Sequence, residues 1–199
     1  GYSRFRHSIG VMLLLKKIGA SLEEQIAGLL HDVSHTAFSH VVDWAIGDQV
    51  KEDHQDKDHQ SFFRRGEMES ILRKHGFKPE TLSNFKNFKL LEQEIPALCA
   101  DRIDYVLIEF DSWAGLKIVK KIIKSLTNIN GKIIFKGKIL AEIFARAFLK
   151  CQAEHWGGYE AVARYYFFAQ ALKVALNKKI LILNDFYQDD IFVVKKLVD

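Results

Sequence analysis

The 199-residue chain has only two cysteines and two prolines, and it contains no long uninterrupted apolar run. Cys99 and Cys151 lie 52 positions apart, which is not a spacing typical of a metal site, and no stretch resembles a signal peptide. We therefore expect a protein of the reducing cytoplasm. Because no apolar run reaches the roughly 18 residues typical of a membrane span, we expect no integral membrane segment and no membrane partner.

Charge of neither sign dominates the chain, which has 29 basic and 25 acidic residues and a net charge of +4 at pH 7. This small surplus suits an anionic ligand, but it does not by itself indicate a nucleic-acid partner. A composition of 48% hydrophobic and 27% charged residues is that of a soluble globular protein. We predict one domain over residues 1–199. The first residue is Gly1 rather than Met, which leaves open a missing natural N-terminal segment.

Apolar residues recur at three- and four-residue spacing in the first third of the chain, which predicts helices. The first helix is expected within residues 1–19 and to end at Gly19. Ser21 followed by Glu24 is a capping-box pattern at the start of a second helix. A third helix is expected to carry His40 and Asp43 on one face.

The middle and end of the chain complete the predicted fold. Residues 47–59 are polar and predict a solvated loop, and a helix is expected over 60–74. Pro96 suits the first turn of a further helix. Asn130-Gly131 predicts a β-hairpin near residues 126–136, and long helices are expected over 139–176 with one more short helix in the tail. The predicted fold is all-α with one small hairpin.

One stretch, LLHDVSHTAFSHVVD, collects titratable groups inside an otherwise apolar sequence. A buried imidazole or carboxylate must be paired, hydrogen-bonded or metal-bound to offset its desolvation. So dense a cluster therefore indicates a chemical role, and we interpret it as binding of a divalent metal and a phosphate ester. Its members are His31, Asp32, His35, His40 and Asp43.

A divalent metal held by nitrogen and oxygen ligands needs imidazoles and carboxylates from several helices, with positions left open for water and substrate. His7, the adjacent His31-Asp32 pair and the distant Asp101 meet that need. The metal could be Mn, Fe, Mg, Ni or Zn, because sites of this composition accept several ions.

The segments RFRHSIG, LLHDVSHTAFSH and CADRIDY together resemble the HD-domain metal-dependent phosphohydrolases. The resemblance implies a helical HD-domain bundle, with a metal-site core over about 1–115 and a helical C-terminal extension over about 116–199. The longer pattern HDxxHxxFSHxxD resembles the deoxynucleoside triphosphate triphosphohydrolase, or dGTPase-like, branch. Members of that branch release deoxynucleoside and tripolyphosphate.

This resemblance implies roles for individual residues. The implied metal ligands are His7, His31, Asp32 and Asp101. His40, oriented by Asp43, is implied as the acid-base or nucleophile-activating residue, and His35 and His59 would face the phosphates. The resemblance also implies substrate-binding roles, in which Arg4 and Arg102 hold phosphate oxygens. Tyr105 and Glu109 would line the sugar site. Glu109 stands where an aspartate is usual in that branch.

Simpler interpretations exist for several of these residues. His40 and Asp43 could satisfy each other in the core, and His35 could cap a turn. His54 competes with His59 for the phosphate-facing role. Arg102 and Tyr105 could be ordinary surface and packing residues, and Cys99 is better explained as a core residue than as a ligand.

Three functions stay open at this point. The first is hydrolysis of deoxynucleoside triphosphates, the second is hydrolysis of another nucleotide or phosphate ester, and the third is nucleotide binding by a regulator without turnover. One metal ion or two are compatible with the pattern, since His35 and His59 could supply a second site. The oligomeric state is open as well. A homo-oligomer is compatible with the sequence, although nothing in the sequence specifies an interface.

Overall fold

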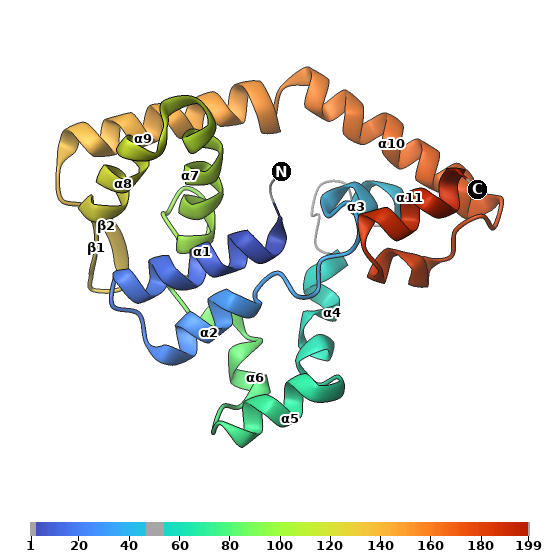
Figure 1. Ribbon diagram of the computed structural model, residues 1–199, viewed down its shortest axis with the longest axis horizontal. Coiled ribbons are helices and arrows are strands. Elements are labelled where there is room, and N and C mark those ends of the chain that lie inside the picture. The colour runs from blue at the N-terminus through green and yellow to red at the C-terminus, as the bar shows by residue number, and fades with distance from the viewer. Residues whose placement is uncertain (1–2, 47–53, 199) are drawn as a thin grey trace. The chain divides into compact units, whose positions relative to one another are not determined.

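The computed structural model describes residues 3–46 and 54–198, with side chains from His59 onward in the second range. Contacts between Cα atoms divide the chain into two compact units (Figure 1). Unit 1 comprises Gly1–Asp32 and Phe63–Glu154, and unit 2 comprises Val33–Phe62 and His155–Asp199. Each unit combines two separate stretches of the chain, and the division of the chain near residue 115 stays a prediction. That the chain forms a single domain stays a prediction.

Unit 1 is built on the packing of helix α1 against α2 and α7. Its core there consists of fully buried aliphatic side chains, among them Val11, Leu15 and Ile103. The helix bounds are α1 Arg4–Lys17, α2 Leu22–Leu30, α5 Gly66–Lys74, α6 Pro79–Leu82, α7 Ala100–Ala114, α8 Leu116–Ser125 and α9 Lys138–Cys151, with a short 3-10 turn at Phe85–Asn87.

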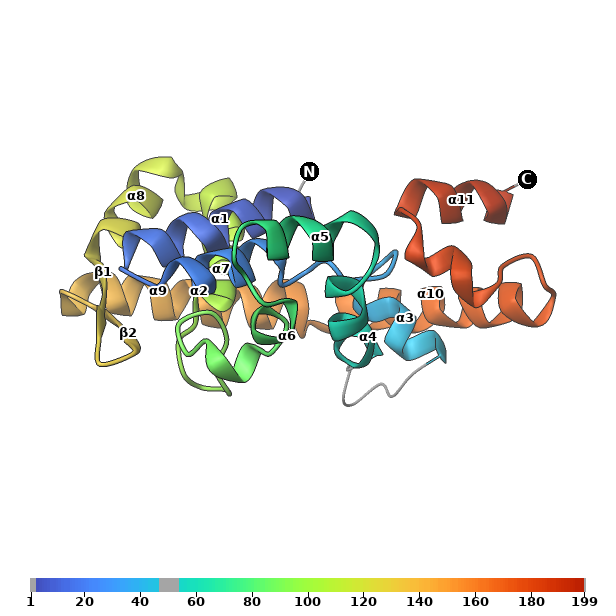
Figure 2. The same ribbon diagram turned by 90° about the horizontal axis from the view of Figure 1, so that it is seen from below.

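The predicted hairpin lies in unit 1, at the same end of that unit as α8 (Figure 2). Strands β1 (Leu126–Ile129) and β2 (Lys132–Phe135) pair antiparallel. Asn130 and Gly131 both have positive φ, 51° and 76°, as a two-residue hairpin turn requires. The prediction of an all-α fold with one small hairpin is confirmed.

Unit 2 consists of helices packed around a core that includes Val42, Leu172 and Phe186. Helix α3 packs against the long helix α10. The elements of this unit are α3 His40–Ile46, α4 His54–Phe63 (whose last residue belongs to unit 1), α10 Tyr159–Asn177, the 3-10 turn Leu183–Tyr187 and α11 Asp190–Val198, and a π-helical segment Gln152–Trp156 precedes α10. Within 3–46 and 54–198 no helix is long and apolar enough to cross a membrane.

Three local predictions were wrong. The helix expected over 60–74 is two helices, because the chain turns at Gly66, whose φ of +55° is left-handed. The loop expected over 47–59 is helical from His54 onward, and residues 47–53 lie outside the described residues. Helix α7 begins at Ala100, so Pro96 precedes the helix instead of occupying its first turn.

The capping box at the start of α2 is only half formed. The hydroxyl of Ser21 accepts a hydrogen bond from the backbone N–H of Glu24, as predicted. The carboxylate of Glu24, however, accepts hydrogen bonds from the backbone N–H groups of Leu90 and Leu91, at 2.7 and 3.1 Å. A buried side chain of α2 thus anchors the segment that leads into α7.

Replacing Glu24 by alanine should destabilise the protein, because two buried N–H groups would lose their acceptor. We expect the free energy of unfolding to fall by about 2 to 4 kcal/mol for Glu24→Ala and by less for Glu24→Gln, which keeps an acceptor oxygen. Denaturant titration measures both. Glu23→Ala removes an exposed neighbour and should change little. Equal losses in the Glu23 and Glu24 alanine variants would contradict the anchoring role.

Candidate metal centre

Three helices of unit 1 bring the predicted metal ligands together. His7 lies in the first turn of α1, and Asp101 lies in the first turn of α7. His31 is the C-cap residue of α2, and Asp32 follows it in the turn. The packing of α1 against both α2 and α7 therefore converges four side chains from distant parts of the sequence.

The ligand atoms of these side chains form a tight cluster. His7 Nε2 lies 2.8 Å from Asp101 Oδ1 and 3.9 Å from Asp32 Oδ2. His31 Nε2 lies 3.2 Å from Asp32 Oδ1, 3.4 Å from Asp101 Oδ1 and 3.3 Å from His7 Nε2. The imidazole nitrogens thus face each other and both carboxylates.

This cluster fits a divalent metal by size and by chemistry. Ligands about 2.1 Å from an ion stand about 3.0 to 3.4 Å apart in octahedral or tetrahedral arrangements, which is close to the observed separations. Two imidazoles and two carboxylates suit Mn, Fe, Ni or Zn, and they leave positions for water and substrate. The assignment of these four residues as ligands stays a prediction that the geometry supports.

Each histidine is held by a second contact through its other ring nitrogen. His31 Nδ1 donates to the carbonyl oxygen of Gly28 at 2.8 Å, and His7 Nδ1 lies 2.8 Å from Asp104 Oδ2. A proton on Nδ1 leaves the lone pair of Nε2 for the metal, and contacts of this kind fix the orientation of ligating imidazoles. Asp104 was not singled out from the sequence. Its position three residues after Asp101, on the same face of α7, was the available signal.

The approach of α1 to Asp104 requires a glycine at position 10. A Cβ atom added to Gly10 would lie 2.2 Å from Asp104 Oδ1 and 2.7 Å from its Cγ, well inside van der Waals contact. Gly10 follows His7 by three residues in the same helix. Because Gly10 has no side chain, α1 can pack closely against α7 and the carboxylate of Asp104 can reach His7.

Charges within the cluster shift the pKa values of His7, His31 and Asp101. Burial would lower the pKa of His7, but the hydrogen-bonded carboxylates of Asp101 and Asp104 raise it to about 10. Burial likewise opposes protonation of His31, yet Asp101 and Asp32 raise its pKa. Burial would raise the pKa of Asp101, but the two imidazoles hold it well below its usual range. The site therefore favours a positive charge between its carboxylates.

A second group of ligand atoms shares Asp101 and adds Glu92 and Cys99. Cys99 is fully buried, and burial raises the pKa of its thiol to about 12, which disfavours the thiolate that binds metals. Glu92 lies 3.6 Å from the guanidinium of Arg102. These contacts favour a structural role for Cys99 over a metal-binding one.

The predicted substrate-binding residues also lie in unit 1. Arg4 is the first residue of α1, and the other three lie on α7. Arg102 donates to the backbone carbonyls of Ala97 and Gln93 as well as facing Glu92. Burial, together with the charge of Asp101, raises the pKa of Tyr105 to about 12, and Glu109 is half-buried.

The remaining predicted residues lie in unit 2. His40 begins α3, and its Nδ1 lies 3.6 Å from Oδ2 of Asp43, which is buried. The rings of His35 and His40 meet edge to face, with centroids 5.5 Å apart. His59, on α4, is buried with Nδ1 2.8 Å from the hydroxyl of Ser34, a partner that the sequence did not suggest.

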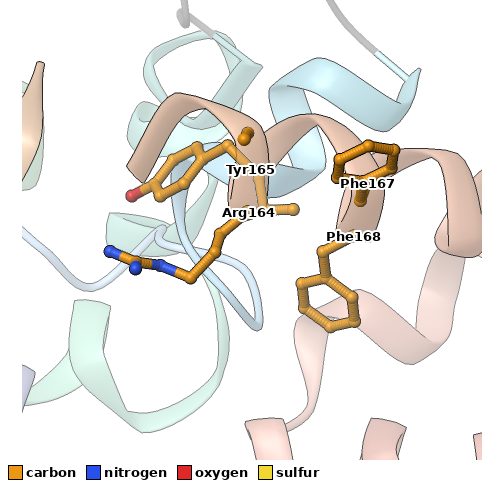
Figure 3. A pocket seen from close by; sticks show the side chains of 6 residues that line it. Arg164, Tyr165, Phe167 and Phe168 are labelled. Atoms are coloured by element: carbon orange, nitrogen blue, oxygen red, sulfur yellow. The ribbon is translucent and has the colours of Figure 1, made fainter. Parts of the chain in front are cut away.

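Two pockets lie in the described part of the chain, and neither is lined by a residue that the sequence predicts to bind metal or substrate or to act in catalysis. One, of about 590 Å³ in unit 2, is formed mainly by aromatic side chains of α10, including Tyr165, Phe167 and Phe168 (Figure 3). The other, of about 260 Å³ in unit 1, lies between α1, α7 and α8, and Asp104 contributes to its wall. The metal cluster is therefore recognised by its ligand chemistry and not by a large cavity.

Comparison with known proteins agrees with the geometry. The chain is 40% identical over 191 residues to the uncharacterized protein YdhJ of Bacillus subtilis, an alignment that covers 94% of this chain and 58% of that protein. It is 30% identical over 162 residues to the metal-dependent phosphohydrolase cns2 of Cordyceps militaris, covering 77% of this chain and 47% of that protein. The chain thus spans about half the length of these curated relatives.

Solved structures share the fold. A phosphohydrolase from Bacteroides thetaiotaomicron superposes with a TM-score of 0.65 at 21% identity, over 99% of this chain and 57% of that one. A hypothetical protein from Aquifex aeolicus gives a TM-score of 0.62 at 19% identity, over 100% of this chain and 59% of that one. The HD domain family model matches residues 4–108, which include all four candidate ligands. The chain belongs to the HD-domain family.

Proposed function

We propose that the chain is a metal-dependent phosphohydrolase whose metal is bound by His7, His31, Asp32 and Asp101. The observation that carries this proposal is that the Nε2 atoms of His7 and His31 lie 3.3 Å apart and that each lies within 4 Å of a carboxylate oxygen of both Asp32 and Asp101. A divalent cation there would polarise a phosphoryl oxygen and lower the pKa of a bound water. The printed name of the Cordyceps militaris relative supports the same reaction class.

The surrounding side chains have distinct proposed tasks. The carbonyl of Gly28 and the carboxylate of Asp104 hold the two imidazoles with Nε2 directed into the cluster. Arg4 and Arg102 would bind phosphate oxygens, for which a guanidinium offers a planar fork. Arg102 donates to two backbone carbonyls, and a guanidinium has five N–H donors, so further N–H groups remain for a phosphate oxygen.

His40 is the proposed general acid. An imidazole suits proton transfer near neutral pH, and the buried carboxylate of Asp43, 3.6 Å away, can orient the ring and stabilise the imidazolium. His35 packs edge to face against the ring of His40. We assign His35 and His59 to phosphate contacts, and for His59 the hydroxyl of Ser34 sets the ring orientation.

The proposed substrate is a deoxynucleoside triphosphate, hydrolysed to deoxynucleoside and tripolyphosphate. Support comes from the pattern HDxxHxxFSHxxD, which this chain carries from His31 to Asp43. Tyr105 and Glu109 would line the sugar site. The phosphate ester could instead be another nucleotide, and the product of the reaction distinguishes the two substrates.

Metal binding can be measured apart from catalysis. Titration calorimetry with MnCl₂ should show binding that Asp101→Asn abolishes and that Asp104→Asn weakens by about 10- to 100-fold, because Asp104 orients His7. Asp111→Asn, on the same helix, is the matched control and should bind as the unmodified protein does. Unchanged affinity in Asp104→Asn would exclude its orienting role, and a failure of Mn²⁺, Fe²⁺, Ni²⁺ and Zn²⁺ alike to bind the unmodified chain would exclude the metal site.

The metal-free protein should lose stability as the pH rises from about 7 to about 10. His7 has a raised pKa of about 10 when folded, and its ordinary value is 6.5, so the folded state holds a proton that the unfolded state releases in this range. Urea titrations in EDTA at several pH values measure the slope. His7→Gln should reduce the slope, whereas His75→Gln, at an exposed position, should not. Part of the slope should remain in His7→Gln because the pKa of His31 is raised as well, and a slope equal to that of the unmodified protein contradicts the assignment.

Hydrolysis is tested by incubating the protein with Mn²⁺ and each dNTP, NTP and nucleoside monophosphate, and separating products by anion exchange. We expect tripolyphosphate from dNTPs, at least 1,000-fold less with Asp101→Ala, and about 100- to 10,000-fold less with His40→Ala. Orthophosphate or a linear nucleotide would redirect the proposal to another ester. Nucleotide binding without any product would indicate a regulator.

A further inference from the structure

One segment of unit 1 accounts for the net positive charge of the chain. Residues 112–141 contain seven lysines, no arginine, and no aspartate or glutamate. Seven of the 29 basic residues lie here, so the rest of the chain has 22 basic and 25 acidic residues. The net charge of +4 therefore arises entirely from this segment. Its lysines are Lys117, Lys120, Lys121, Lys124, Lys132, Lys136 and Lys138.

Helix α8 presents four of these lysines as one stripe. Positions 117, 120, 121 and 124 have the i, i+3, i+4, i+7 spacing of a single helical face. Val119 and Ile122, on the other face, are buried in unit 1. The three further lysines follow in the hairpin and at the start of α9, and all seven are exposed. Figure 2 shows α8 and the hairpin at one end of this unit.

These charges are not neutralised by neighbouring carboxylates. In the part of the chain that the structure describes, Lys138 is the one member of the seven that pairs with an acidic side chain, Glu142 at 3.6 Å. Lys17, at the end of α1, adds a further cation beside the hairpin, where its ammonium donates to the backbone carbonyl of Leu126 in β1. Burial, with the charge of the nearby Lys136, lowers the pKa of Lys17.

Exposed apolar side chains are interspersed with the lysines. Leu116 and Ile129 are each 53% exposed, and Ile139 is 74% exposed. Trp113 and Ile134 are exposed to a smaller extent. We call these five apolar residues and the seven lysines the basic surface.

The composition of the basic surface favours a lipid partner over a nucleic acid. Four of the five apolar side chains are aliphatic and cannot stack on bases, which leaves Trp113 as the one aromatic member. The basic surface also contains no arginine, whose guanidinium would bind guanine or phosphate through two parallel hydrogen bonds. Lysines mixed with aliphatic side chains and a tryptophan are instead typical of peripheral attachment to anionic membranes.

We propose that the basic surface binds membranes that contain anionic phospholipids, with the lysines facing the headgroups and the apolar side chains entering the interface. Peripheral binding of this kind needs no spanning helix. It therefore revises the expectation of no membrane partner, which rested only on the lack of a membrane span. The proposal is independent of the proposed hydrolase activity.

Vesicle sedimentation with the full chain tests the proposal. The protein should sediment with vesicles of phosphatidylcholine containing 30% phosphatidylserine and remain in solution with phosphatidylcholine alone. Each lysine close to an anionic surface strengthens binding about fivefold. The variant with Lys117, Lys120, Lys121 and Lys124 all changed to Gln should therefore bind at least 10-fold more weakly.

A second variant removes the same charge elsewhere. Changing Lys173, Lys178, Lys179 and Lys195 of unit 2 to Gln gives an equal loss of net charge and should leave vesicle binding nearly unchanged. Ile129→Ser with Ile139→Ser should weaken the binding that persists at high salt. Circular dichroism confirms that each variant is folded.

Three outcomes would overturn the proposal. The first is no sedimentation of the unmodified chain with anionic vesicles. The second is an equal loss in both quadruple variants, which would show that only net charge matters. The third is tighter binding to a single-stranded oligonucleotide than to the vesicles, which would indicate a nucleic-acid surface.

Discussion

The contact between α1 and α7 is the constraint on which the candidate site depends. His7 reaches Asp101 with one ring nitrogen and Asp104 with the other, and these two carboxylates lie one helical turn apart. Such a bidentate arrangement fixes the imidazole in rotation and in position. Gly10 permits it, because any side chain there would collide with Asp104. The candidate metal site and the core of unit 1 therefore depend on the same packing of α1 against α7.

The sequence was sufficient for the helical fold, the hairpin and the cluster of candidate ligands, for reasons that are local or chemical. Asn130-Gly131 requires positive φ at both positions, and a His-Asp pair in an apolar helix end is costly without a ligand. Contacts between distant segments were not accessible. Glu24 was interpreted as a capping residue because only its neighbours in sequence were visible, whereas its partners are the N–H groups of Leu90 and Leu91. Asp104 was missed for the same reason.

The motif from His31 to Asp43 is continuous in sequence but is shared between two compact units. His31 and Asp32 complete the imidazole and carboxylate cluster of unit 1, whereas His35 and His40 contact each other in unit 2. The two groups have different surroundings as well. The first is dominated by charge pairing between imidazoles and partly buried carboxylates, and the second by ring packing and by the carboxylate of Asp43. The proposed metal ligands and the proposed general acid can therefore be substituted in different units.

Unit 1 is assembled from two segments, and unit 2 supplies the 30 residues between them. His7, His31 and Asp32 therefore leave the ribosome 69 residues or more before Asp101. At about 5 to 20 residues per second, this interval lasts about 3 to 14 seconds. During that time α1 can pack against α2 but not yet against α7. The four candidate ligands therefore come together only after the chain has been synthesised through α7.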